Sequence, residues 1–134
     1  KVEHMQPLSV LVVDANQSFL GFTVRYLEET YAGRVCVAGA ARPDEALALA
    51  AASRPQMVLV GLSGPVGAAL ALIAELRQCG VHHVVAMSQL GSAGYAHAAL
   101  AAGATAFADK DRLQIELASI LNGLINHWAY ERGV

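Results

Sequence analysis

The sequence predicts an α/β fold: a doubly wound, five-stranded parallel sheet of the flavodoxin-like order 2-1-3-4-5, with helices on both faces. Two observations support this prediction. Short apolar runs recur along the chain, each bounded by glycine, proline or polar residues, which is typical of strands buried on both faces. Segments with apolar residues at helical spacing separate these runs, and right-handed crossovers then imply parallel neighbours. The favoured strand order is common in doubly wound sheets.

The clearest apolar run, residues 57–60, follows Pro55 and stops at Gly61. Ligands of open parallel sheets bind beyond the carboxyl ends of the strands, so this strand end is a central position. Gly61 has no side chain and cannot act as a nucleophile, an acid or a metal ligand. Further strands of the same character are expected at Leu8–Val13, 34–38, 81–87 and 105–108.

A segment with the pattern of a helix follows each predicted strand. Asn16 or Ser18 can cap the first of these helices, and Pro43 with two acidic residues after it suits the start of the second. The expected helices are Gln17–Thr30, Pro43–Ser53, Val66–Gln78, 91–102 and 112–127.

These elements predict one domain at residues 8–127, preceded by a leader at 1–7 and followed by a tail at 128–134. A His-Met pair inside the leader is typical of an expression-vector remnant. The tail contains aromatic residues, which in such a position either dock back on the domain or meet a partner.

Composition excludes several functions. The chain has 9 basic and 11 acidic residues and no basic run, so we expect no contact with nucleic acid. No apolar run is long enough to cross a bilayer and no signal peptide is recognisable, so we expect a cytoplasmic protein without membrane contact. Cys36 and Cys79 form no CxxC motif, and the pair His82-His83 lacks a third ligand, so neither predicts a metal site.

Small and polar residues gather at the predicted carboxyl ends of the strands. Because these ends share one edge of the sheet, we expect the residues there to lie close together. They are Asp14, Ala15 and Asn16 after the first strand, Gly61 after the third, Ser88 after the fourth, and Asp109 and Lys110 after the fifth.

From about residue 8 to residue 126 the chain resembles the receiver domain of bacterial two-component response regulators. The run Leu-Val-Val-Asp that ends at Asp14 is similar to the family's first strand and its acidic end. Residues 54–65 resemble its third strand and the proline turn that follows. Residues 102–107, Ala-Gly-Ala-Thr-Ala-Phe, together with Lys110 resemble its last strand and lysine.

The resemblance implies a role for each of these positions. In receivers a carboxylate at the Gly61 position accepts a phosphoryl group, and acids at the Asp14 and Ala15 positions help to hold magnesium. The hydroxyl at the Ser88 position and the lysine at the Lys110 position contact the phosphoryl group. Here the acceptor is glycine and one acid is alanine, and magnesium needs several oxygen ligands. The chain therefore resembles an atypical pseudo-receiver, and we expect no catalytic residue, no metal and no cofactor.

We expect no other residue to replace the acceptor. Ser63 is displaced around a turn, and Ser88 and Asp109 lack an obvious activating base. Since Lys110 has lost its usual carboxylate, we expect it to pair with Asp14 across the pocket, either directly or through water.

Two pocket residues have alternative interpretations. Ser88 either moves as a switch towards a ligand or satisfies nearby backbone, which is the simpler reading. Phe107 either rotates, as the family's switch aromatic does, or is a plain core ring.

In receivers the fourth helix, fifth strand and fifth helix often form a dimerisation face. Tyr95, His97, Arg112 and Glu116 lie on these predicted elements. We expect either such an interaction face or an ordinary solvated helix surface.

The sequence thus predicts a non-enzymatic signalling module of the two-component type. It would act through a protein partner or self-association, as the N-terminal part of a transcriptional regulator. The alternative is a small-molecule-binding flavodoxin-like domain that uses the strand-end crevice, although neither GxGxxG nor a P-loop is present. A third hypothesis is a receiver that still accepts a phosphoryl group.

Overall fold

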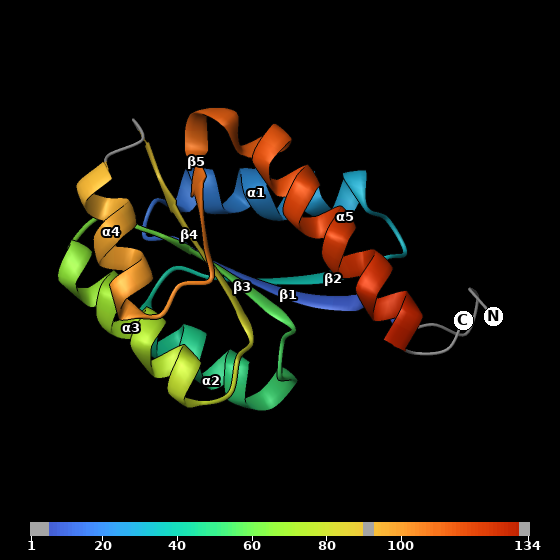
Figure 1. Ribbon diagram of the computed structural model, residues 1–134, viewed down its shortest axis with the longest axis horizontal. Coiled ribbons are helices and arrows are strands. Elements are labelled where there is room, and N and C mark those ends of the chain that lie inside the picture. The colour runs from blue at the N-terminus through green and yellow to red at the C-terminus, as the bar shows by residue number, and fades with distance from the viewer. Residues whose placement is uncertain (1–5, 90–92, 132–134) are drawn as a thin grey trace.

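The computed structural model describes residues 6–89 and 93–131, with side chains up to residue 127 at the C-terminal end. It contains the predicted parallel sheet, in the order β2-β1-β3-β4-β5 (Figure 1). Both the fold class and the strand order are as the sequence predicts. The strands are β1 (Leu8–Val13), β2 (Val35–Ala40), β3 (Met57–Gly61), β4 (His83–Ser88) and β5 (Ala106–Asp109).

Five α-helices alternate with the strands, and a short 3₁₀ turn precedes the last helix. The turn, η3, covers Lys110–Arg112. The helices are α1 (Gln17–Thr30), α2 (Pro43–Ser53), α3 (Val66–Gln78), α4 (Ala93–Ala102) and α5 (Leu113–Glu131).

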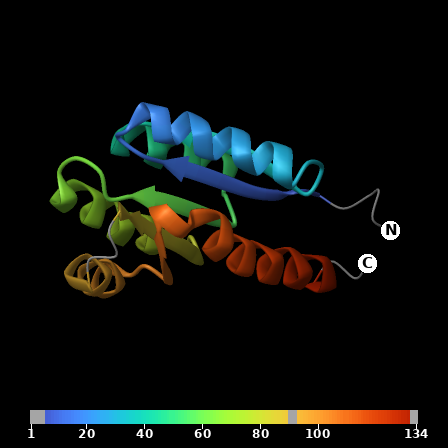
Figure 2. The same ribbon diagram turned by 90° about the horizontal axis from the view of Figure 1, so that it is seen from above.

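The sheet separates two helical layers. Helices α1 and α5 cover one face, and α2, α3 and α4 cover the other (Figures 1 and 2). Alternation along β3 shows the division, because Met57 and Leu59 pack towards α1 and α5 whereas Val58 and Val60 pack towards α2 and α3. All four side chains are at most 1% exposed. A strand buried on both faces explains why its sequence is continuously apolar.

Several predicted boundaries were wrong by a few residues. Strand β2 begins one residue later than expected and extends to Ala40, where its backbone carbonyl accepts a hydrogen bond from the Asp14 N–H at 3.1 Å. Helix α5 runs to Glu131 instead of ending near residue 127, because no proline or glycine interrupts that stretch. Trp128 and Tyr130 therefore belong to the helix backbone. The first predicted residues of α4 lie outside the described part of the chain.

The expected loop after the fifth strand is also more regular than predicted. Asp109 closes β5, and its Oδ1 accepts a hydrogen bond from the Asp111 N–H at 2.9 Å. This cap starts η3 and leads directly into α5. The turn fixes the backbone of Lys110, its first residue.

None of the described helices is both long enough and apolar enough to cross a membrane.

Candidate functional site

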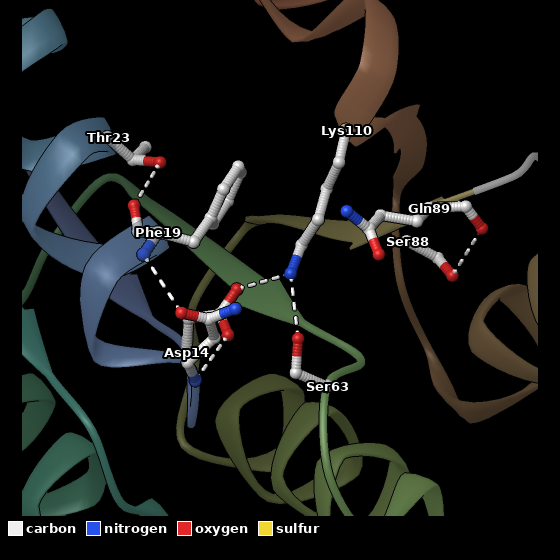
Figure 3. A network of polar contacts seen from close by, with 8 residues as sticks. Asp14, Phe19, Thr23, Ser63, Ser88, Gln89 and Lys110 are labelled. Atoms are coloured by element: carbon white, nitrogen blue, oxygen red, sulfur yellow. Dashed lines mark hydrogen bonds and ion pairs between the residues drawn. The ribbon is translucent and has the colours of Figure 1, made fainter.

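The carboxyl ends of β1, β3, β4 and β5 bring the predicted pocket residues to one edge of the sheet. Strand register places Val13 beside Val60, and Ser88 beside Asp109. The side chains that meet there come from chain segments far apart in sequence (Figure 3).

Asp14 follows β1 and is completely buried, with no exposed side-chain surface. Its Oδ1 accepts a hydrogen bond from the Asn16 N–H at 2.9 Å. Asn16 in turn caps α1, because its Oδ1 accepts a hydrogen bond from the Phe19 N–H at 3.1 Å. The predicted helix cap is therefore confirmed, and the same turn positions the Asp14 carboxylate.

Lys110 reaches across the edge of the sheet to this carboxylate. Its Nζ lies 2.7 Å from Asp14 Oδ2, and the lysine side chain is only 5% exposed. The expected Asp14–Lys110 ion pair is thus direct. Nζ also donates a hydrogen bond to Ser63 Oγ at 2.8 Å and lies 4.2 Å from the centroid of the Phe19 ring. Three groups therefore surround the ammonium, which compensates in part for its removal from water.

Asp14 Oδ2 depends on this ammonium for its charge balance. Among the described residues, no donor meets Oδ2 with good hydrogen-bond geometry. The short distance to Lys110 Nζ nevertheless makes the pair an ion pair. Removing either partner would leave the other as an uncompensated buried charge.

Gly61 explains how Asp14 can lie where it does. A Cβ built on Gly61 would collide with Asp14 Oδ2 and lie 2.5 Å from Asp14 Cγ. The aspartate carboxylate therefore occupies the space that a side chain at position 61 would enter. The sequence indicates that a side chain is missing at position 61, but the overlap with Asp14 depends on the side-chain conformation of Asp14 and has no local signal.

Ser88 and Phe107 flank this centre without joining it. Ser88 is 7% exposed, and its hydroxyl donates a hydrogen bond to the Gln89 carbonyl at 3.3 Å (Figure 3). This contact agrees with the simpler interpretation, in which the Ser88 hydroxyl forms a hydrogen bond with nearby backbone. Phe107 is half-buried and packs against the core that α2, α3 and α4 share with the sheet.

Asp109 does not enter the pocket, because its side chain caps η3. Its backbone N–H donates to Glu116 Oε1 at 2.8 Å. Ser63 and Phe19 were the residues that sequence analysis missed as partners of the lysine. Phe19 has the helical spacing of an ordinary core residue, so only the tertiary structure reveals its contact with the ammonium.

The pocket does not fit a magnesium ion. Ala15 supplies an exposed methyl group instead of a carboxylate, and the remaining acid, Asp14, is already neutralised by Lys110. Within the residues that the structure describes, no group of three His, Cys, Asp or Glu side chains could hold a metal ion. His82 is exposed and His83 half-buried, and burial lowers the pKa of His83 below its ordinary value, as do the charges of neighbouring His82, His127 and Arg77.

The hollows beside the pocket are small. One of about 60 Å³ is lined by Asp14 and Gly61, and another of about 200 Å³ by Ser63, Ser88 and Lys110. Both are smaller than the roughly 300 Å³ at which small-molecule pockets begin. A larger groove of about 900 Å³ lies at the opposite end of the strands, between the C-terminal ends of α2 and α3. The crevice volume therefore does not favour the small-molecule alternative.

The predicted interaction face contains both exposed and structural residues. Tyr95 is 42% exposed, and His97 is also exposed. Arg112 Nε lies 3.9 Å from Glu116 Oε2, in a pair whose arginine is 65% exposed. Glu116 is held more firmly, through the Asp109 N–H. A separate row of rings on α1 was not singled out by sequence analysis and is formed by Phe19, Phe22 and Tyr26.

No family model matches the chain, and no curated protein matches it either. Solved structures do match. The receiver domain of NtrX from Brucella abortus is 26% identical, with a TM-score of 0.70, over 84% of this chain and 98% of that one. The BeF3-activated N-terminal receiver domain of RstA from Klebsiella pneumoniae is 20% identical, with a TM-score of 0.76, over 87% and 97% of the two chains.

A third match is a two-component response regulator of the LuxR family from Aurantimonas, 20% identical with a TM-score of 0.77, over 91% of this chain and 87% of that one. At such identities the likeness establishes architecture. The two receiver-domain matches cover nearly the whole of those domains and most of this chain. This chain has the fold of the receiver domains of two-component response regulators.

Proposed function

We propose that this chain is an atypical receiver of two-component-type signal transduction, which acts in the cytoplasm through protein contacts and is not an enzyme. The observation that carries the proposal is at Gly61. Where the resembled family has its acceptor carboxylate, this chain has no side chain, and Asp14 fills the adjoining space. Covalent phosphoryl transfer requires an attacking atom, and position 61 offers none.

The neighbouring hydroxyls are poor substitutes for the acceptor. Ser63 Oγ accepts a hydrogen bond from the Lys110 ammonium, a contact that lowers its nucleophilicity. The Ser88 hydroxyl donates a hydrogen bond to the Gln89 backbone carbonyl, and a carbonyl cannot act as a general base. Among the described residues, no carboxylate or imidazole forms a hydrogen bond with either serine. These contacts support a receiver that signals without phosphorylation at the usual position.

Incubation with acetyl phosphate and magnesium, followed by intact-mass measurement, tests this proposal. We expect no phosphoryl adduct on this chain. The RstA receiver domain of Klebsiella pneumoniae, incubated in parallel, is a suitable positive control because its BeF3-activated form is known. A stoichiometric adduct on this chain would refute the proposal, and peptide mapping would then identify the residue.

The proposed contact surface is formed by α4, β5 and α5. Tyr95 and Leu100 on α4 are both more than 40% exposed, unlike most of the large apolar residues that the structure describes. A partner or a second copy would bury them. By analogy with the N-terminal receiver of RstA and the LuxR-family regulator, we place the domain at the N-terminal end of a transcriptional regulator.

Light scattering tests this surface. We expect self-association, or binding to a partner domain, to be weakened by Tyr95→Ala. The matched control is Phe22→Ala, which removes an aromatic ring of similar exposure from α1. Equal effects of the two substitutions would contradict the assignment to α4.

A further inference from the structure

A chain of direct contacts leads from Gly61 to the surface of α1. The Asp14 carboxylate fills the space beside Gly61 and pairs with Lys110. The Lys110 ammonium lies over the Phe19 ring. Figure 3 shows Asp14, Lys110 and Phe19 side by side, contributed by the loop after β1, by η3 and by α1.

The aromatic row on α1 continues this chain of contacts to the solvent. The Phe19 and Phe22 ring centroids are 6.3 Å apart, as are those of Phe22 and Tyr26. Phe22 is 49% exposed. The buried Thr23 hydroxyl donates to the Phe19 backbone carbonyl at 2.8 Å, one turn earlier on the same helix. The contacts of the Lys110 ammonium therefore continue through Phe19 to the exposed Phe22 ring and the half-buried Tyr26 ring.

Asp14 has little freedom to move while these contacts persist. Its Oδ1 is held by the Asn16 N–H, and its Oδ2 by the Lys110 ammonium. Because the carboxylate is excluded from water, solvent cannot replace a lost partner. A side chain at position 61 and the present position of Asp14 therefore exclude each other.

We infer that Asp14 is a built-in substitute for the missing acceptor carboxylate: it takes the vacated space, occupies Lys110, and thereby holds the α1 aromatic row in one arrangement. The inference rests on the proposed function only in identifying position 61 with the acceptor. This arrangement of Asp14, Lys110 and Phe19 couples the conformation of the pocket to that of α1. Within the described residues, no hydrogen bond or ion pair connects Lys110 to Ser88, which lies at the end of β4.

A double-mutant cycle tests the coupling. Gly61→Ala should lower the melting temperature by several degrees in the natural chain, because its methyl group expels Asp14 from Lys110. In the Asp14→Ala background, the same substitution should lower the melting temperature much less. Gly67→Ala is the matched control, since a Cβ on that α3 glycine meets no atom within 4 Å, and it should not lower the melting temperature. Equal costs of Gly61→Ala in both backgrounds would overturn the inference.

Aromatic NMR provides a second measurement that does not require the Asp14 variant to fold. In Gly61→Ala we expect the ring resonances of Phe19, Phe22 and Tyr26 to shift, whereas Gly67→Ala should leave them in place. Unchanged resonances in Gly61→Ala would also overturn the inference. The two claims fail separately, because a phosphoryl adduct on the natural chain would refute the proposed function without removing the coupling.

Discussion

Asp14 and Lys110 form a buried ion pair, with Oδ2 and Nζ 2.7 Å apart and with at most 5% of either side chain exposed. The pair joins the end of β1 to the turn after β5. It also occupies the two charged groups that the resembled family uses to bind its phosphoryl group and metal. Most of the expected behaviour of this domain follows from that contact.

Loss of one member of the pair should strongly destabilise the fold. We expect Lys110→Met to lower the free energy of unfolding by about 3–5 kcal/mol, because the Asp14 carboxylate stays buried without a cation. Urea denaturation measures this change. The double variant Asp14→Asn with Lys110→Met should recover a large part of the loss. Asp44→Asn, which breaks the exposed Arg42–Asp44 pair, should have almost no effect.

Restoration of a phosphoryl acceptor should require more than one substitution. Gly61→Asp supplies an attacking carboxylate, yet the pocket still lacks the acid at Ala15 that would help to hold magnesium. We therefore expect Gly61→Asp to form less adduct with acetyl phosphate than the double variant Gly61→Asp with Ala15→Asp. Intact-mass measurement gives the two yields. Equal and substantial yields would contradict this prediction, because they would show that the second carboxylate at position 15 is not needed for the metal.

Glu116 should contribute to stability through the backbone and not through Arg112. Its Oε1 accepts the Asp109 N–H at 2.8 Å, whereas the contact with Arg112 is long and solvent-exposed. We expect Glu116→Ala to lower the free energy of unfolding by about 1 kcal/mol or more, because the Asp109 N–H at the end of β5 loses its acceptor. Arg112→Ala should change the unfolding free energy by less than about 0.5 kcal/mol. The reverse ranking in chemical denaturation would contradict this assignment.

His83 should make the fold less stable in mild acid. Burial lowers its pKa in the folded state, and His82, His127 and Arg77 act in the same direction. The unfolded chain therefore binds the proton more readily, and the stabilisation present above the ordinary histidine pKa is lost as the pH falls below it. Between about pH 7.5 and pH 5.5, the loss of unfolding free energy should be smaller in His83→Gln than in the natural chain. His82→Gln, at an exposed imidazole, should retain more of the pH dependence.

The fold could be predicted from the sequence because its signals are local. Apolar runs such as 57–60, bounded by proline and glycine and alternating with helical segments, predict one parallel sheet. The carboxyl ends of its strands then bring Asp14 near Lys110. The ion pair was predictable for the same reason. Local patterning cannot reveal which chain segments supply further contacts, so Ser63 and Phe19 were not identified as partners of the ammonium.

Two other differences have equally physical causes. The end of α5 was placed too early because residues 127–131 contain no proline or glycine that would mark where the helix stops. The overlap between Asp14 and position 61 was not foreseen, since it arises from one side-chain torsion in a packed environment. The residue type at position 61 shows that the pocket lacks a carboxylate there, and only the folded structure shows that Asp14 fills the space.

The contact between Asp14 and Lys110 also has a consequence for folding kinetics. The two residues lie near opposite ends of the sheet-forming sequence, and β1, β3, β4 and β5 are neighbours in that order in the sheet that brings them together. A contact between such distant positions closes a large loop, which slows folding, and we expect this pair to form after the folding transition state. Removal of the pair should therefore accelerate unfolding far more than it slows refolding.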